Sequence, residues 1–154
     1  MLNSRNTTVG FAERTRKNLL AIEAAREAGE DVHVVTQLIN SLLGLVVFPW
    51  ERGFREHTEH LELEALDAEG WPRWDVERGE CHTLGRLLRL LRNGAAHSHI
   101  EFSSDSRRLD DVVIKIWNVP PKSAPDPDFV ASIRADHLRD FCLKFTDLVL
   151  DRVG

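Results

Sequence analysis

Between residues 81 and 99 the sequence gathers basic side chains and contains no acidic residue. These side chains are Arg86, Arg89, Arg92, His82, His97 and His99. A guanidinium group stays charged and can make two parallel hydrogen bonds to phosphate oxygens. An imidazole titrates near neutral pH, so it can both accept and donate a proton. Because RNA carries its own nucleophile, the 2′-hydroxyl group, an arginine and a histidine in this segment could cleave RNA without a metal ion.

The most specific pattern in this segment is Arg92, the polar Asn93 directly after it, and His97. The same spacing from arginine to histidine occurs at 52–57 and 55–60. In both of these cases no asparagine follows the arginine, and the surrounding acidic side chains would repel a phosphate. Arg92, Asn93 and His97 are therefore the candidate catalytic residues. The competing interpretation is a structural helix cap or a site that only binds.

Residues 80–95 are predicted to form the helix that carries this pattern. Leucines recur in this stretch with the spacing of one buried helical face. At 100° per residue, Arg86, Arg89 and Asn93 fall on the opposite face together with His82, and Arg92 lies on the flank. Arg86 and Arg89 are candidate substrate-binding residues, although a solvated helix face explains them equally well. His99 is a further substrate-binding candidate, or it only caps the strand that it begins.

On a regular helix the side chains of Arg92 and His97 point about 140° apart. A frayed or bent helix end, or the long reach of the arginine, is needed to bring both to one phosphate. Gly94 lies between them, and glycine weakens a helix and permits such a bend.

The other elements predict a mainly α protein. The predicted helices cover residues 8–28, 32–47 with Asp31 as a cap and a break at Pro49, 80–95, and a C-terminal stretch that begins at Asp126-Pro127. Residues 99–102 and 112–117 are predicted to pair as a β-hairpin. The expected fold is an antiparallel bundle of four or more helices, with this hairpin between the motif helix and the C-terminal helix. A strand at one end of 32–47 is a competing prediction, and 51–80 is hard to assign.

Length and composition set limits on the class of protein. With 154 residues, 42% of them hydrophobic and 29% charged, the chain is predicted to be one globular domain over residues 1–154. The net charge of −5 argues against a protein that coats nucleic acid through bulk charge. The segment 51–80 alone holds ten acidic and four basic residues, a net of −6, which suits a protein partner at least as well as a nucleic acid.

The location that these features favour is the cytoplasm. The N-terminus lacks the apolar stretch of a signal peptide. The longest apolar stretch, 38–50, is shorter than the ~20 residues that span a bilayer, so no membrane association is expected. The only two cysteines, Cys81 and Cys142, lie far apart and indicate no disulfide scaffold.

Other chemically active side chains give weaker signals. His57 and His60 have a spacing that a metal site could use, but no third ligand is evident, so neither a metal nor another cofactor is expected. Trp71 and Trp74 could stack on bases, although packing against a core is the favoured interpretation.

Residues 92–97, Arg-Asn-Gly-Ala-Ala-His, resemble the signature of the HEPN domain (higher eukaryotes and prokaryotes nucleotide-binding). That signature is an arginine, a polar residue directly after it and a histidine a few residues on, near the end of a helix in a small helical bundle. The segment TQLINSLLGLVVFPWE, with a hairpin after the motif, is similar to a plasmid- and prokaryote-associated HEPN subgroup.

This resemblance implies a metal-independent endoribonuclease that leaves a 2′,3′-cyclic phosphate and pairs two motifs across a homodimer. Arg92 would bind and polarise the phosphate, His97 would transfer protons, with one such histidine from each protomer, and Asn93 would orient the site. Family members serve in toxin–antitoxin and other defence systems, so a cognate antitoxin or another protein partner is expected beside RNA.

A non-catalytic HEPN-like module that binds RNA, a nucleotide or a protein partner is the alternative. A helical transcription-type regulator is less favoured, because neither helix-turn-helix spacing nor a wide basic surface is evident.

Overall fold

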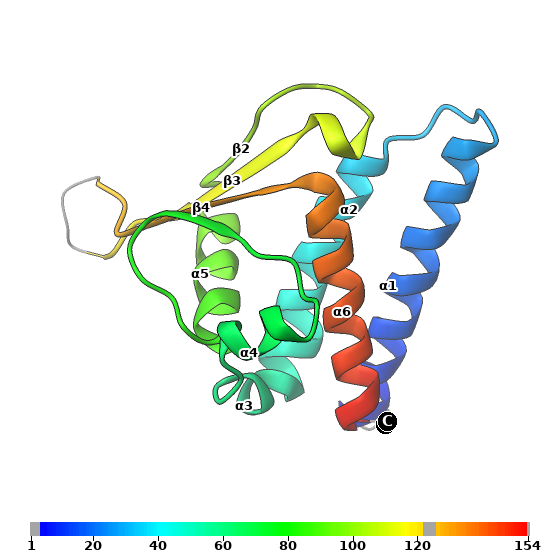
Figure 1. Cartoon of the computed structure of the whole chain (residues 1–154). Helices are drawn as coiled ribbons and strands as arrows, with labels where there is room; N and C mark the ends of the chain where they lie inside the picture. Colours follow the sequence, from blue (N-terminus) through cyan, green and yellow to red (C-terminus); the bar gives the residue numbers. More distant parts are fainter. Residues whose placement is uncertain (1–3, 122–125, 154) are drawn as a thin grey trace.

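The computed structural model describes residues 4–121 and 126–153 of the chain (Figure 1). In chain order the elements are α1 (Ser4–Glu27), α2 (Val34–Leu45), the π-helical segment η1 (Val46–Phe54), α3 (Arg55–Thr58), α4 (Leu63–Ala68), β1 (Asp75–Arg78), α5 (Leu84–Ala96), β2 (Ile100–Phe102), the 3-10 turn η2 (Leu109–Asp111), β3 (Val113–Asn118), β4 (Phe129–Arg134) and α6 (Ala135–Val153). Helices dominate, so the prediction of a mainly α chain is confirmed.

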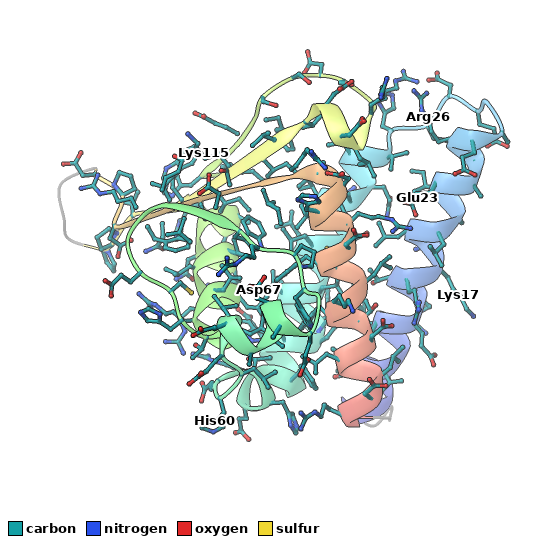
Figure 2. The ribbon with its side chains drawn as sticks, in the orientation of Figure 1. Lys17, Glu23, Arg26, His60, Asp67 and Lys115 are labelled. Carbon is teal, nitrogen blue, oxygen red and sulfur yellow. The ribbon has the colours of Figure 1, made fainter. Side chains whose placement is uncertain are left out.

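Three long helices, α1, α2 and α6, pack side by side, and the sheet lies over α5 and leads through β4 into the start of α6 (Figure 1). Two ion pairs join α1 to α6: Arg16 Nη1 lies 2.6 Å from Asp147 Oδ1, and Arg139 Nε lies 2.5 Å from Glu23 Oε1. Because the later α1 residue pairs with the earlier α6 residue, the two helices run antiparallel. Figure 2 labels Glu23 on α1, the helix that faces α6 along this contact.

The second predicted helix does not end at Pro49, which is a correction to the sequence analysis. The helix continues past Leu45 and widens into the π-helical turns of η1, with Pro49 inside. Proline has no N–H to donate and its ring crowds the preceding turn of an α-helix. The wider π turn accommodates that ring, and such turns occur often at functional sites. Trp50 and Phe54 remain buried on η1, and Trp50 Nε1 donates to Thr58 Oγ1 at 3.0 Å.

The stretch Val34–Glu51 is long and apolar enough to cross a membrane, judged by length and mean hydropathy. This differs from the sequence-based expectation, which considered only 38–50 and found it too short to span a bilayer. Within the structure 44% of this 18-residue window is buried. A core helix of a soluble protein meets the same criterion.

The sheet has four antiparallel strands in the order β1-β4-β3-β2. The predicted strands 99–102 and 112–117 correspond to the neighbours β2 and β3, but β4 and β1 extend them into a larger sheet. Asp126-Pro127 was expected to begin the last helix, and this was wrong. Phe129–Arg134 pairs along its whole length with Val113–Asn118 as β4, and α6 begins only at Ala135. The tertiary pairing of six residues outweighs a local helix-start signal.

One face of the sheet closes the hydrophobic core. Ile114 and Ile116 on β3 and Ile133 on β4 are almost fully buried, together with the leucines of α5 and the aromatic residues of α6. Trp71 and Trp74 pack edge-on against Phe141, with ring centroids 5.6 and 5.9 Å apart. This packing favours a core role for the two tryptophans.

Two predicted helix starts are also corrected. Asp31 does not cap α2, because its side chain pairs with Arg107, and His33 occupies the cap position without a side-chain hydrogen bond. The motif helix α5 begins at Leu84 instead of residue 80, and Thr83 caps it by accepting a hydrogen bond from the Arg86 amide at 3.2 Å. A threonine cap satisfies one of the free amides of the first turn.

Candidate active site

Gly94 brings the C-terminal part of α5 against β3. A Cβ at this position would lie 2.6 Å from Ile116 Cγ2 and 2.6 Å from the Trp117 carbonyl oxygen. Only glycine leaves room for so close an approach. The helix continues through Gly94 to Ala96, so this glycine serves helix–sheet contact and not the bend that the sequence suggested. The end of the motif helix is thereby fixed beside the sheet.

The helix end itself is a Schellman motif. The Ser98 amide donates to the Ala95 carbonyl at 3.1 Å, and the His99 amide donates to the Gly94 carbonyl at 2.7 Å. Ser98 has a φ of 60°, the left-handed conformation that this motif requires after the last helical turn. The conformation is uncommon for residues other than glycine. It turns the chain sharply, so that His97 and His99 lie on the two sides of the turn.

Arg92 is held by two neighbours. Its Nε lies 2.5 Å from Glu51 Oε1, and its Nη1 donates to Asn93 Oδ1 at 3.2 Å. The Arg92 and Glu51 side chains are 41% and 32% exposed, so a ligand from solvent can reach the pair. Glu51 comes from the π-helical segment η1, which the wider turns at Pro49 place beside α5. Asn93 therefore orients the guanidinium, and Glu51 offsets its charge.

His97 and His99 form a second cluster at the same helix end. Their ring centroids are 5.9 Å apart, and the His99 ring stacks on Trp117 at 5.5 Å with an angle of 14° between the planes. His97 is exposed and His99 is half-buried. Among the described residues no hydrogen bond joins Arg92 to His97.

The predicted substrate-binding arginines lie along the same helix. Arg86 is exposed near the start of α5, and Arg89 is half-buried one turn before Asn93. Arg89 Nε is buried without a hydrogen-bond partner in the described part of the chain. His82, which was expected on this face, precedes the helix, and its Nε2 lies 3.7 Å from Glu80 Oε2.

Sequence reasoning missed Glu51 and Trp117. No local pattern links Glu51 to Arg92, because their contact exists only once η1 packs on α5. Trp117 carried a usable signal: in the alternating strand Val-Ile-Lys-Ile-Trp, it falls on the face opposite Ile114 and Ile116.

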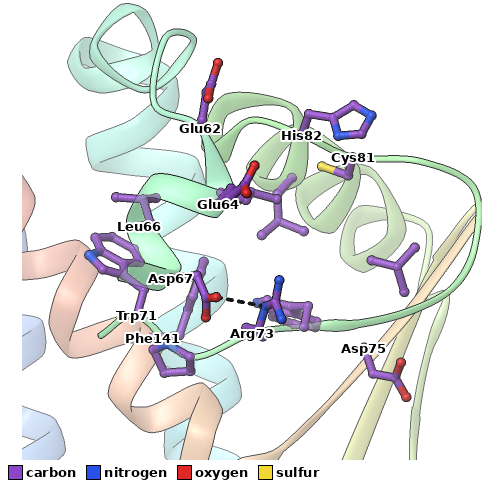
Figure 3. Close-up of a pocket in the computed structure, with 15 residues that line it drawn as sticks. Glu62, Glu64, Leu66, Asp67, Trp71, Arg73, Asp75, Cys81, His82 and Phe141 are labelled. Atoms are coloured by element: carbon purple, nitrogen blue, oxygen red, sulfur yellow. Dashed lines mark ion pairs between the residues drawn. The ribbon is translucent and has the colours of Figure 1, made fainter. Parts of the chain in front are cut away.

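A separate cavity of about 770 Å³ lies between α4, the loop into β1 and the start of α5 (Figure 3). Its charged lining residues are Glu62, Glu64, Asp67, Asp75 and Arg73. Figure 3 shows the one guanidinium paired with the Asp67 carboxylate, with Nε and Oδ2 3.3 Å apart. Four carboxylates would repel a phosphate, so this cavity does not suit RNA backbone. His82 lines it and so belongs to this acidic surface.

The remaining titratable groups suit neither a metal nor thiol chemistry. In residues 4–121 and 126–153 no group of three His, Cys, Asp or Glu side chains could hold a metal ion. Burial raises the pKa of the Cys81 thiol to about 11 and that of the Cys142 thiol to about 12. Thiolates are the reactive form of cysteine, so both residues are inert near neutral pH.

A mainly helical chain that carries Arg-Asn and His at the end of one helix, beside a small sheet, has the features of a HEPN-type domain. The profile of the family described as HEPN pEK499 p136 matches residues 1–154. The chain therefore belongs to the HEPN family, in this plasmid-associated subgroup. Comparison with curated proteins and with solved structures gave no significant match.

Proposed function

We propose that the protein is a metal-independent endoribonuclease whose catalytic residues are Arg92, Asn93 and His97. One observation carries the proposal: a partly exposed guanidinium, oriented by an asparagine, shares the end of α5 with an exposed imidazole. Arg92 binds and polarises the scissile phosphate. His97 transfers a proton, and Arg86, Arg89 and His99 contact the substrate.

The reaction is an internal transfer at phosphorus. The 2′-hydroxyl oxygen attacks the adjacent phosphorus as its proton passes to a base, and the bond from phosphorus to the 5′-oxygen breaks as that oxygen receives a proton from an acid. The products are a 2′,3′-cyclic phosphate and a 5′-hydroxyl end. Positioned proton transfer contributes roughly 10²–10⁴-fold to such a rate. The guanidinium stabilises charge that develops on the non-bridging oxygens.

The whole chain acts as one HEPN domain and works as a homodimer, in which a two-fold axis brings two copies of Arg92 toward one RNA. The protein acts in the cytoplasm, and its substrate there is RNA. Family membership supports a role as a toxin or a component of a defence system. The acidic segment 51–80 then suits a cognate antitoxin or another protein partner.

The test is incubation of purified protein with end-labelled single-stranded RNA in EDTA, beside a His97→Ala variant prepared identically. We expect the wild type to cut RNA to cyclic-phosphate ends and to leave DNA of the same sequence intact. The variant should lose at least 100-fold in rate. Cleavage of DNA, or a strict requirement for a divalent ion, contradicts the proposal.

A second function, a non-catalytic module, is favoured by the ion pair between Glu51 and Arg92. A guanidinium already neutralised by a carboxylate suits a binding surface as well as a catalyst. In that case His97→Ala would leave binding of RNA, nucleotide or protein partner intact, and neither protein would cut RNA.

A further inference from the structure

The cavity between α4, the loop into β1 and the start of α5 takes no part in the proposed reaction. Its volume of about 770 Å³ is within the range of ~300–1,000 Å³ that is typical of ligand sites. The candidate catalytic residues lie at the other end of α5, a helix of 13 residues that spans about 20 Å. A ligand in this cavity therefore leaves the site around Arg92 free.

The lining of the cavity combines apolar walls with carboxylates (Figure 3). Its buried apolar side chains are Leu66, Trp71, Leu87 and Phe141. Its exposed carboxylates that have no ion-pair partner within residues 4–121 and 126–153 are Glu62, Glu64 and Asp75. An arginine side chain matches both parts, because it carries a charged head on an apolar stem and its guanidinium can make two hydrogen bonds to a carboxylate. The cavity thus suits a cation that is attached to an apolar stem.

The chain itself already places one guanidinium at this lining. Arg73 Nε lies 3.3 Å from Asp67 Oδ2, and Figure 3 shows the two side chains pointing toward each other. The Arg73 side chain is 75% exposed, so most of it lies in solvent and the cavity keeps room for a second cation. The lining has four carboxylates against one guanidinium, a net charge of −3 with His82 neutral. A further cation from a ligand would offset this charge.

The cavity borders an open edge of the sheet. β1 is the outermost strand in the order β1-β4-β3-β2, and in the described part of the chain it pairs with no strand except β4. All four residues of β1 are exposed, and its first two, Asp75 and Val76, line the cavity. The backbone of an outer strand can pair with an extended peptide, whose alternate side chains then point to the same side. A peptide along β1 would bring one of its side chains to the cavity.

We propose that the cavity and the outer edge of β1 together bind an extended, arginine-bearing segment of a partner protein. The segment adds a strand beside β1, and one of its arginine side chains enters the cavity. The guanidinium of that arginine binds Glu64 and Asp75, and its apolar stem packs against Trp71. The inference builds on the proposed function, which expects a protein partner for the acidic segment 51–80 but gives it no site.

Charged side chains on an edge strand can also serve only to prevent aggregation. Either sign of charge gives that protection, and Arg78 on β1 contributes to it. Protection of an edge requires neither an apolar cavity beside the strand nor carboxylates without partners around that cavity. The acidic lining adds selectivity, because it repels acidic segments and attracts basic ones.

The first experiment measures the binding of a short labelled peptide, in which arginine and valine alternate, by fluorescence anisotropy at about 0.15 M salt. Glu64→Gln combined with Asp75→Asn should raise Kd by roughly tenfold, because two ion pairs are lost. Both side chains are exposed, so this variant should fold, which circular dichroism verifies. The matched control, Glu13→Gln combined with Glu27→Gln, removes the same charge from exposed positions on α1 and should change Kd by less than about twofold.

The second experiment changes the peptide and keeps the protein intact. Citrulline has the shape of arginine without its charge, so replacing each arginine by citrulline should raise Kd by roughly tenfold. Backbone N–H groups of a strand alternate in direction, so only one set of alternate amides faces β1. Of two peptides, one methylated on the arginine amides and one on the valine amides, one should lose binding by at least about tenfold and the other should keep most of it.

Four outcomes would overturn the inference. The cavity variant and the α1 variant weaken binding equally, so that only bulk charge matters; the citrulline peptide binds as well as the arginine peptide; the two methylated peptides bind equally, so that no strand pairs with β1; or the wild type binds spermidine as tightly as the peptide, so that the site takes a small cation. Absence of peptide binding up to about 1 mM would overturn it as well. RNA cleavage is not among these readouts, so failure of the inference and failure of the proposed ribonuclease activity are distinguishable.

Discussion

Glu51 and Arg92 form an ion pair between two segments that are far apart in the sequence, with Oε1 of one 2.5 Å from Nε of the other. Glu51 stands on the π-helical turn that follows Pro49, and Arg92 stands in the last turns of the motif helix. The pair is partly exposed, so its contribution to stability is about 1 kcal/mol or less. The ion pair matters more for RNA binding, because a phosphate bound here must share the Arg92 guanidinium with the Glu51 carboxylate.

Replacement of Glu51 by glutamine should strengthen RNA binding and slow cleavage. The amide keeps the shape and removes a negative charge beside the phosphate, so we expect Kd to fall by roughly fivefold, about 1 kcal/mol. The amide oxygen of glutamine binds a guanidinium more weakly than a carboxylate does, so Arg92 is held less firmly and the single-turnover rate should fall by about tenfold. Fluorescence anisotropy with labelled RNA measures the first effect. Glu59→Gln, at the ion pair with Arg55, is the control. Weaker RNA binding by the Glu51 variant would contradict this account.

Arg92→Lys should behave almost as badly as Arg92→Ala. Lysine keeps the charge but lacks the planar fork that contacts two phosphate oxygens. We expect a loss of 10²–10³-fold in the cleavage step. Arg86→Lys, at an exposed position six residues closer to the helix start, should lower the cleavage rate by less than threefold. Single-turnover cleavage of one labelled RNA by all three variants is the measurement. Equal rates for Arg92→Lys and wild type would show that charge alone suffices.

Gly94→Ala should destabilise the protein, although alanine is the better helix former. The gain in helix propensity is about 1 kcal/mol. The added methyl group would lie 2.6 Å from a backbone carbonyl oxygen and from Ile116 Cγ2, and such overpacking costs about 1–3 kcal/mol. The clash outweighs the propensity, and Tm should fall by several degrees. Gly10→Ala is the matched control in α1, because its nearest neighbour is the flexible end of Arg14. That variant should be neutral or stabilised.

Stability should fall at alkaline pH because of the buried Cys142 thiol. Burial raises its pKa to about 12 in the folded protein, whereas an exposed thiol ionises near ~8.5. The unfolded chain therefore loses this proton first, and the free energy of unfolding decreases as pH rises from about 9 towards 12. The chain has no tyrosine to mask the effect. In Cys142→Ala the decline in Tm between pH 8 and pH 10.5 should be shallower. An unchanged slope would assign the decline to other groups.

Part of the candidate site could be predicted from the sequence. Arg92, Asn93 and His97 were identified from residue type and spacing. The leucine pattern placed Arg92 and Asn93 on a helix that the structure contains, and His97 follows the last residue of that helix. Their partners were not identified. Glu51 reaches Arg92 only through the packing of η1 on α5, and Trp117 reaches His99 only through the Schellman turn at Ser98. Contacts of this kind depend on a relative orientation that no local pattern specifies.

The sequence by itself determined which side chains carry charge and protons, the acid-free segment that holds them, and the helical periodicity that separates that face from the core. These properties are local, because they follow from residue type and from a repeat of 3.6 residues. Only the tertiary structure decided that Pro49 widens a helix instead of ending it, and that Phe129–Arg134 is a strand instead of a helix start. In both cases tertiary contacts, of η1 with α5 and of β4 with the sheet, outweigh local preferences. These preferences are about 3 kcal/mol against a proline inside a helix and about 1 kcal/mol for a residue in a strand.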